Sequence, residues 1–219
     1  MQNRILKLVI SLILNSVGNA LAISTCLGAV IWTAAGEGVA AIIQQSIGLS
    51  LTLFGVMIIV VCCILKKKIE WVKEAGNFIF MLVFSYIIEF CTKGFVSIGV
   101  PNLPIVVRVF LNLLAVILIA AAVALYQQAN LVMHPNDELM FLIRKRVKNG
   151  NAIVAQFIAY VFPVTLTVSA FLLKGSWFAI GIGTLISFLF QGFFVEQTDK
   201  VIAFFSQKSI ESEKKTSRI

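Results

Sequence analysis

The sequence predicts an all-α, polytopic membrane protein. Six transmembrane helices are expected to form two inverted three-helix repeats, with short broken or re-entrant helices after spans 1 and 4. The first observation is composition, since the 219 residues are 59% hydrophobic and 13% charged, whereas soluble chains are about 45–50% apolar and about 25% charged. The second is that the apolar residues gather in runs, and a bilayer core about 30 Å thick requires roughly 20 apolar residues per helix. The third is that connections rich in Lys and Arg alternate with connections that are poor in them.

The first half of the chain contains three apolar runs. We expect spans at Ile5 to Ile23, Gly48 to Leu65 and Ala75 to Cys91. The connection between the first two runs is semi-polar and holds Trp32 and Glu37 but no Lys or Arg. It therefore predicts the short broken or re-entrant helix after span 1.

A turn divides the sequence near its middle, because Gly94 to Pro104 contains glycines and two prolines. Beyond it we expect spans at Ile105 to Ala129, Ala152 to Leu173 and Trp177 to Val195. Pro163 should kink the fifth span, as neighbouring helices tolerate in membranes. Residues 1–95 then form the first repeat, residues 104–196 the second, and residues 197–219 a charged cytoplasmic tail of one membrane domain.

The basic residues predict the orientation. They cluster at the N-terminus, at Lys66–Lys68, at Arg144–Lys148 and in the tail. Basic connections remain in the cytoplasm, so both termini are expected on the cytoplasmic side of the cell (plasma) membrane. The net charge of +8 is thereby explained without nucleic acid. The tracts Lys66–Lys68 and Arg144–Lys148 are expected to contact anionic lipid headgroups of the bilayer.

Weak internal similarity predicts a duplication. At an offset of 104 residues, Leu27-Gly28 aligns with Leu131-Val132, and at an offset of 106, Lys68-x-x-Trp71 aligns with Lys174-x-x-Trp177. Because each half has an odd number of spans, the second half should enter the membrane upside down relative to the first. The semi-polar segment of each half would then enter the membrane from the opposite face.

Two acidic residues stand out in apolar surroundings. Glu89, in the third expected span, is either a proton-coupling or cation-binding carboxylate or the partner of Lys93 at i, i+4. Glu37, between two glycines, either lines a cavity or caps a short helix in the headgroup region. The sequence leaves both alternatives open.

The fourth expected span ends in a polar stretch. Asn136 or Asp137 can cap a helix that runs to Arg144, and the same residues could instead contact a solute at the mouth of a broken helix. His134 is the only histidine; it could sense pH or contact a solute, but an exposed surface position is the simpler interpretation. The candidate substrate or ion contacts are Trp32, Glu37, Glu89, Tyr126, Asn130, His134, Asn136 and Asp137.

No residue pattern supports metal binding, a cofactor or catalysis. The four cysteines lack CxxC spacing, and no catalytic constellation can be assembled, so the protein is not expected to be an enzyme. Gly181-x-Gly183-Thr184 lacks the Gly-Lys-Ser/Thr of a phosphate loop. We interpret it as helix packing within the sixth span.

Several second-half motifs resemble those of the YczE/YyaS/YitT-like bacterial integral membrane proteins. They are Ala124-Leu125-Tyr126, Pro135-x-Asp137-x-Leu139-Met140, and Lys174-Gly175 followed by Gly181-x-Gly183-Thr184. The resemblance implies a transport-type membrane protein of uncharacterised function. In the first half, Leu27-Gly28-Ala29-Val30-Ile31-Trp32-Thr33 keeps the Gly and Trp of the family's Leu-Gly-x-x-Pro-Trp-Asp but lacks the Pro and the acid. A site shared by both halves is therefore expected to be lopsided.

The preferred hypothesis is a bacterial inner-membrane transporter of an unknown small solute or ion, with its cavity between the inverted halves. It requires a polar cavity between Trp32 and Asp137. The alternative is a non-transporting membrane subunit, either a substrate-binding component or a regulatory or assembly partner of a larger complex. A homodimer or another protein partner is compatible with either hypothesis.

Overall fold

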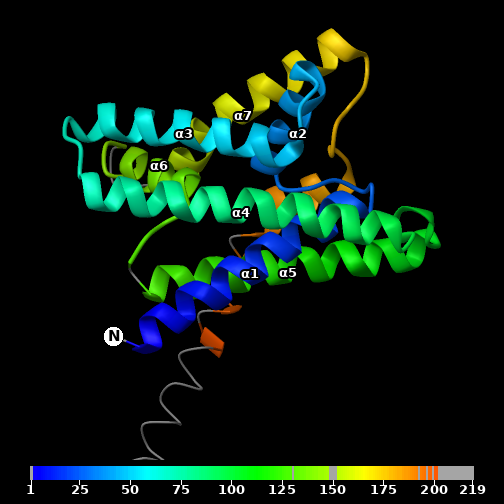
Figure 1. Ribbon diagram of the computed structural model, residues 1–219, viewed down its shortest axis with the longest axis horizontal. Helices are drawn as coiled ribbons and strands as arrows, with labels where there is room; N and C mark the ends of the chain where they lie inside the picture. The colour runs from blue at the N-terminus through cyan, green and yellow to red at the C-terminus, as the bar shows by residue number, and fades with distance from the viewer. Residues whose placement is uncertain are drawn as a thin grey trace, which may run out of the picture.

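The structure is a computed structural model that describes residues 2–129, 131–147, 152–191, 193–195, 197–198 and 200–201. These residues form helices and no strands. The elements are α1 (Gln2–Ser24), α2 (Ile31–Ile43), α3 (Ile47–Lys66), α4 (Trp71–Ser97), the 3-10 helix η1 (Val100–Asn102), α5 (Ile105–Ala129), α6 (Pro135–Arg144) and α7 (Ala152–Lys174) (Figure 1). A shorter apolar helix, Ile182–Gln191, follows α7.

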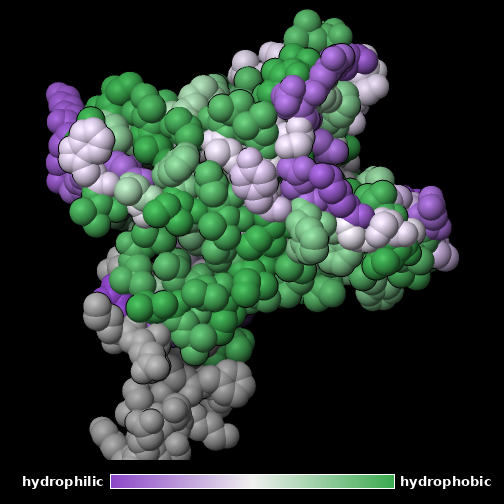
Figure 2. Space-filling view, in the orientation of Figure 1, coloured by the Kyte–Doolittle hydropathy of each residue, from purple (hydrophilic) through white to green (hydrophobic). Residues whose placement is uncertain are grey.

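Five helices are long and apolar enough to cross a membrane, namely α1, α3, α4, α5 and α7. Large apolar side chains on them are exposed, including Phe90 at 79% and Leu172 at 76%. Figure 2 shows hydrophobic side chains along the length of the long helices and hydrophilic ones gathered toward their ends. Lipid can solvate such a surface and water cannot, so the chain is a helical membrane protein.

The expected span boundaries differ from the structure mainly at α4 and at the expected sixth span. The helix in the region of the expected sixth span begins at Ile182 instead of Trp177, because residues before it bend to meet the turn after α1. Its described residues are too few to count as a span, so the sixth span stays a prediction. Helix α4 is longer than expected at both ends and leaves only a short turn before α5.

Helices α1 and α5 are antiparallel and closely packed. Arg4 Nε donates to the Ala129 carbonyl at 2.8 Å, and Arg108 Nη1 donates to the Thr25 carbonyl at 3.2 Å. Each arginine near the start of one helix therefore caps the end of the other helix. Gly18 permits the close approach, since a Cβ there would lie 3.0 Å from the Ala115 carbonyl oxygen.

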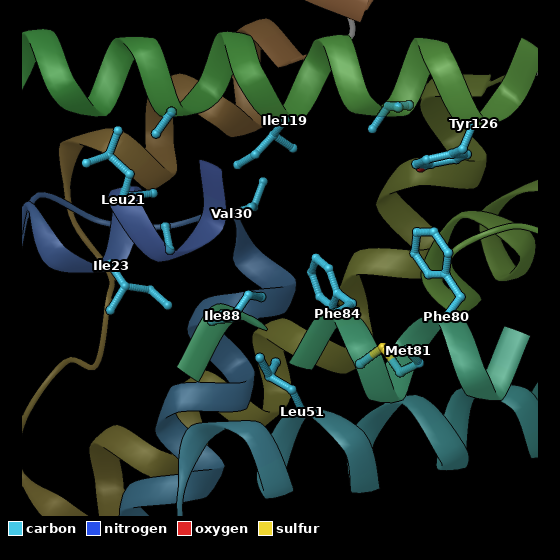
Figure 3. Close-up of a cluster of buried hydrophobic side chains, with 14 residues drawn as sticks. Leu21, Ile23, Val30, Leu51, Phe80, Met81, Phe84, Ile88, Ile119 and Tyr126 are labelled. Atoms are coloured by element: carbon cyan, nitrogen blue, oxygen red, sulfur yellow. The ribbon is translucent and has the colours of Figure 1, made fainter. Parts of the chain in front are cut away.

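The main core lies between this helix pair and α3 and α4. In Figure 3, Phe80 and Phe84 of α4 point toward α5, which contributes Ile119 and Tyr126. Tyr126 is completely buried. Burial of rings of this size accounts for much of the packing free energy that holds the helices together.

The two short helices each pack against both α3 and α7. Helix α2 packs against α7, where Gly38 faces Ala170, and α6 packs against α3, where Cys62 Sγ lies 3.9 Å from the Pro135 carbonyl. Each short helix follows a long helix and a short extended connection. The expected short helices after spans 1 and 4 are thus present.

The turn after α1 pairs with the segment before the Ile182–Gln191 helix. Ala29 N donates to the Ala179 carbonyl at 2.8 Å, and Gly183 N donates to the Leu27 carbonyl at 2.7 Å. Gly28 has φ +111°, and a Cβ on it would lie 2.5 Å from Thr184 Oγ1. Gly181 lies in the turn before the helix, which corrects the expectation that it packs inside a span, whereas Gly183 lies inside the helix and permits its close contact with Asn112 of α5 and with Gly28.

Candidate functional site

A cavity lies near the middle of the long helices. Its lining comes from all seven helices α1 to α7 and from Gln191, and it includes Phe84, the middle residue of α4. It offers about 80 Å³ to water-sized particles, which is room for several water molecules or one small solute. Both Trp32 and Asp137 line it.

One wall is built by the start of α2 and the facing part of α1. Thr33 Oγ1 donates to Asn19 Oδ1 at 2.5 Å, and Asn19 Nδ2 donates to Asn15 Oδ1 at 2.9 Å. The residue that precedes α2 is Val30, which has no side-chain hydrogen bond to the helix end. This wall therefore carries an uncharged polar chain and an uncapped helix N-terminus.

The opposite wall is built by the start of α6. His134 caps this helix, because its Nδ1 accepts the Asn136 backbone N–H at 3.4 Å. An imidazole that accepts at Nδ1 carries its proton on Nε2 when neutral, and burial lowers the pKa of His134 to about 4. Among the described residues, neither His134 Nε2 nor Asn136 Oδ1 has a hydrogen-bond partner, although both atoms are buried.

Asp137 supplies the acid of the cavity. It is half-buried, and its Oδ2 accepts a hydrogen bond from the Tyr126 hydroxyl. Burial raises the pKa of Asp137 from 3.8 to about 6, and the hydrogen bond from Tyr126 opposes that rise. The acid therefore titrates closer to neutral pH than an exposed aspartate does.

Aromatic rings close the cavity on two sides. The Trp32 and Phe54 rings are 5.4 Å apart, and Phe54 stacks on Phe162 at 5.4 Å. The Phe84 ring meets the His134 ring edge-on at 4.8 Å. These contacts fix the orientation of the Trp32 ring at the start of α2 and of the His134 ring at the start of α6.

Only some of the expected site residues lie at the cavity. Trp32, His134, Asn136 and Asp137 line the cavity, and Tyr126 contacts it through Asp137. Glu37 and Glu89 are not among the lining residues, and Asn130 lies outside the described residues. Two expectations were wrong: His134 is buried instead of exposed, and it caps α6 in place of Asn136 or Asp137.

Glu89 has the alternative role expected for it. Its Oε1 accepts from Lys93 Nζ at 2.7 Å, and its Oε2 accepts from Gly48 N at 3.1 Å. It therefore pairs at i, i+4 and also caps the start of α3, where a negative charge is favourable. Glu37 has a buried Oε2 without a partner among the described residues.

Sequence reasoning missed a buried ionic network at one end of α6. Glu138, with a side chain 1% exposed, accepts hydrogen bonds from Lys66, Lys73 and Asn77, and Lys66 also pairs with Glu74. The alternating charges on either side of the α3–α4 turn were a signal for it.

The network corrects the expected lipid contact of Lys66, whose side chain is 6% exposed and paired. Lys67 and Lys68 remain exposed. In the second basic tract, Arg146 bonds the Leu65 and Leu142 carbonyls, and Lys148 lies outside the described residues. Contact of these tracts with anionic lipid otherwise stays a prediction.

Comparison with known proteins gives a family and no function. No curated protein and no solved structure matches the chain. The resemblance to YczE/YyaS/YitT-like proteins stays a prediction. The model of DUF6198, a family of unknown function, matches residues 2–200, so the chain belongs to that family.

Proposed function

We propose that this membrane protein transports a small solute or ion through the cavity between two inverted halves. The observation that carries the proposal is the cavity itself. First-turn residues of both α2 and α6 line it, and two of its lining residues, His134 and Asn136, each have a buried polar side-chain atom, Nε2 and Oδ1, without a partner among the described residues. Buried polar groups are normally hydrogen-bonded, so these two atoms favour a site that a solute fills.

Reciprocal contacts support the inverted repeat. Arg108 lies 104 positions after Arg4, and their acceptors, Thr25 and Ala129, are also 104 positions apart. Ile31 and Pro135, where α2 and α6 begin, have the same offset. Two copies that exchange equivalent contacts in this way are related by an approximate two-fold axis, and transporters place their sites on such an axis.

We also propose a sixth span and an orientation of the chain in the membrane. The helix that begins at Ile182 occupies the place in the second half that α4 occupies in the first. A sixth span returns the chain to the face where it began, which agrees with basic tracts near both ends of the sequence. We therefore assign both termini to the cytoplasm.

Solute flux in liposomes tests the proposal. Purified protein is reconstituted, and osmotic light scattering follows entry of formate, acetate, chloride, urea and glycerol. Ala159→Leu places extra volume in the cavity lining, and Val161→Leu, which adds a single methylene on the exposed face of the same helix, controls for substitution by leucine in α7.

We expect at least one solute to enter faster than in protein-free liposomes. Ala159→Leu should remove most of that entry and Val161→Leu should leave it unchanged, with gel filtration confirming that both variants fold. Absence of flux for the whole panel would instead favour the non-transporting subunit. Co-purification of a stable, stoichiometric partner in mild detergent would then identify the protein as such a subunit.

A further inference from the structure

We infer that the cavity selects a small monovalent anion and that a proton on Asp137 accompanies the bound anion. This inference rests on the proposed function, since it names the solute class of the same site. Four features of the cavity lead to it: two helix N-termini, an unpaired donor, the absence of a lining cation, and a single acid.

Two helix N-termini converge on the cavity. Helices α2 and α6, of 13 and 10 residues, both have first-turn residues in the lining, Trp32 and Thr33 in one and Asn136 and Asp137 in the other. A helix N-terminus acts as about half a positive elementary charge. At α2 no side chain caps the helix end, and a helix N-terminus of this kind can bind a negatively charged ligand through its first N–H groups.

A buried donor points to a ligand independently of the helix ends. His134 is 6% exposed, and its Nε2 has no partner in the described part of the chain. Because Nδ1 already accepts the Asn136 N–H, Nε2 carries the proton and seeks an acceptor. Asn136 Oδ1 is likewise buried without a partner among the described residues, and exchange of the amide oxygen and nitrogen would put a second donor at that position.

The charges of the lining residues and of the two helix ends determine the sign and the number of charges that a bound ligand should carry. None of the described lining residues is Lys or Arg, and Asp137 is the only acid among them. Among the described titratable groups, Tyr126 of α5 donates to Asp137, Tyr160 of α7 and His134 line the cavity with it, and the α1, α2, α3 and α4 residues in the lining are uncharged. Ionised Asp137 therefore balances the two helix ends, each about half a positive charge.

Protonation of Asp137 removes that balance. The carboxylate takes up one proton from solvent and becomes neutral, and the two helix ends are left with about one uncompensated positive charge. One monovalent anion then restores neutrality in a place where an unpaired charge is costly. A divalent anion would leave about one uncompensated negative charge there, and the rings of Trp32, Phe54 and Phe84 in the lining offer it no compensating charge.

Trp32 allows the binding step to be measured directly. The chain has three tryptophans, and Trp71→Phe with Trp177→Phe leaves Trp32 as the only reporter, in the cavity lining. Fluorescence of this variant in nanodiscs is titrated with sodium formate, sodium acetate and sodium chloride, and with urea and methylammonium as neutral and cationic probes. A second variant that retains only Trp71 reports non-specific effects.

We expect at least one of the three anions to change Trp32 emission, and urea and methylammonium to leave it unchanged. The anion affinity should rise by about tenfold or more between about pH 8 and about pH 5, because Asp137 gains its proton in that range. Asp137→Asn imitates the protonated acid, so it should bind the anion at the higher pH with the affinity that the parent protein has at the lower pH. Loss of the pH dependence in this variant identifies Asp137 as the proton acceptor.

His134→Asn tests the donor without removing the cap. The asparagine oxygen can accept the Asn136 N–H in place of Nδ1, and asparagine is a favoured capping residue. This variant lacks Nε2, so its anion affinity should fall by about tenfold or more, while its unfolding temperature stays close to that of the parent. Equal affinity in this variant would overturn the assignment of His134 as the anion donor.

The anion-binding and flux experiments test the two proposals independently. Anion binding without flux would support the anion site and overturn transport. Flux of urea or glycerol without any anion response would support transport and overturn the anion class. A pH dependence that persists in Asp137→Asn would overturn the role of its proton.

Discussion

The Tyr126 hydroxyl donates a hydrogen bond to Asp137, and this contact joins the main core to the cavity. Tyr126 lies on a transmembrane helix and is completely buried, whereas Asp137 lies in the first turn of α6. The rigid part of the molecule thus sets the position and the proton affinity of the acid that faces the cavity.

Removal of that hydroxyl should destabilise the protein in a pH-dependent way. Tyr126→Phe leaves the ionised carboxylate without its donor, at a cost of about 1.5–3 kcal/mol, and raises the pKa of Asp137 beyond about 6. The loss should be large at about pH 8, where the acid is ionised, and small at about pH 5, where it is protonated. Thermal unfolding in detergent measures it.

Tyr86→Phe is the matched control, since Tyr86 is 51% exposed and its hydroxyl should contribute nothing measurable. The direction of this pH dependence agrees with the linkage between protonation of Asp137 and folding. The folded-state pKa of Asp137 lies above the unfolded value of 3.8, so ionised Asp137 lowers stability, and this cost disappears as the pH falls from about 6 toward 4. Equal destabilisation by Tyr126→Phe at both pH values would contradict this account.

The ionic network should be far more sensitive than surface ion pairs. Glu138→Ala leaves Lys66 buried without one of its two acids, and removal of one member of a buried pair costs about 3–5 kcal/mol. Glu70→Ala breaks the exposed pair with Lys68, whose side chain is 64% exposed, and should change stability by less than about 1 kcal/mol. Urea unfolding or thermal unfolding of the two variants compares them, and similar losses would show that the network is unimportant.

Glycine substitutions test the contact between the two turns. Gly28→Ala forces a side chain into a φ of +111° and against Thr184 and Gly181, so the protein should fold poorly or lose several kcal/mol of stability. Gly94→Ala meets nothing within 4 Å and lies inside α4, where alanine is favoured by roughly 0.5–1 kcal/mol. Yield after gel filtration and the unfolding temperature distinguish the two. Normal behaviour of Gly28→Ala would mean that the turns do not touch.

The spans were largely predictable, because membrane solvation acts on local composition. The expected Ile105 to Ala129 coincides with α5, and the expected Gly48 to Leu65 ends within one residue of α3 at both ends. The short helix after the fourth span was expected to end at Arg144, as it does. Its start was misplaced because histidine is an uncommon capping residue, and its capping contact depends on burial against Phe84.

The site was predictable only in part. The polar stretch near Asp137 was recognised because its composition changes abruptly, and Trp32 was found through the repeat. The network around Glu138 was missed, because Lys66 and Glu138 are 72 positions apart and a lysine at the end of a span is typical of an interface residue. Asn15 and Asn19 were interpreted as helix-packing residues and Thr33 was not expected at the site, since isolated polar residues in an apolar helix usually bond within their own helix.

Accessibility of the cavity from both membrane faces tests the central claim most directly. In a background without Cys26, Cys62, Cys63 and Cys91, Met140→Cys places one thiol in the cavity lining, and Val161→Cys places one on an exposed face of α7. A small charged methanethiosulfonate reagent is applied to right-side-out and inside-out vesicles. We predict that Met140→Cys reacts from both faces and Val161→Cys from neither. Reaction of Met140→Cys from one face only, or from neither, would contradict transport through this cavity.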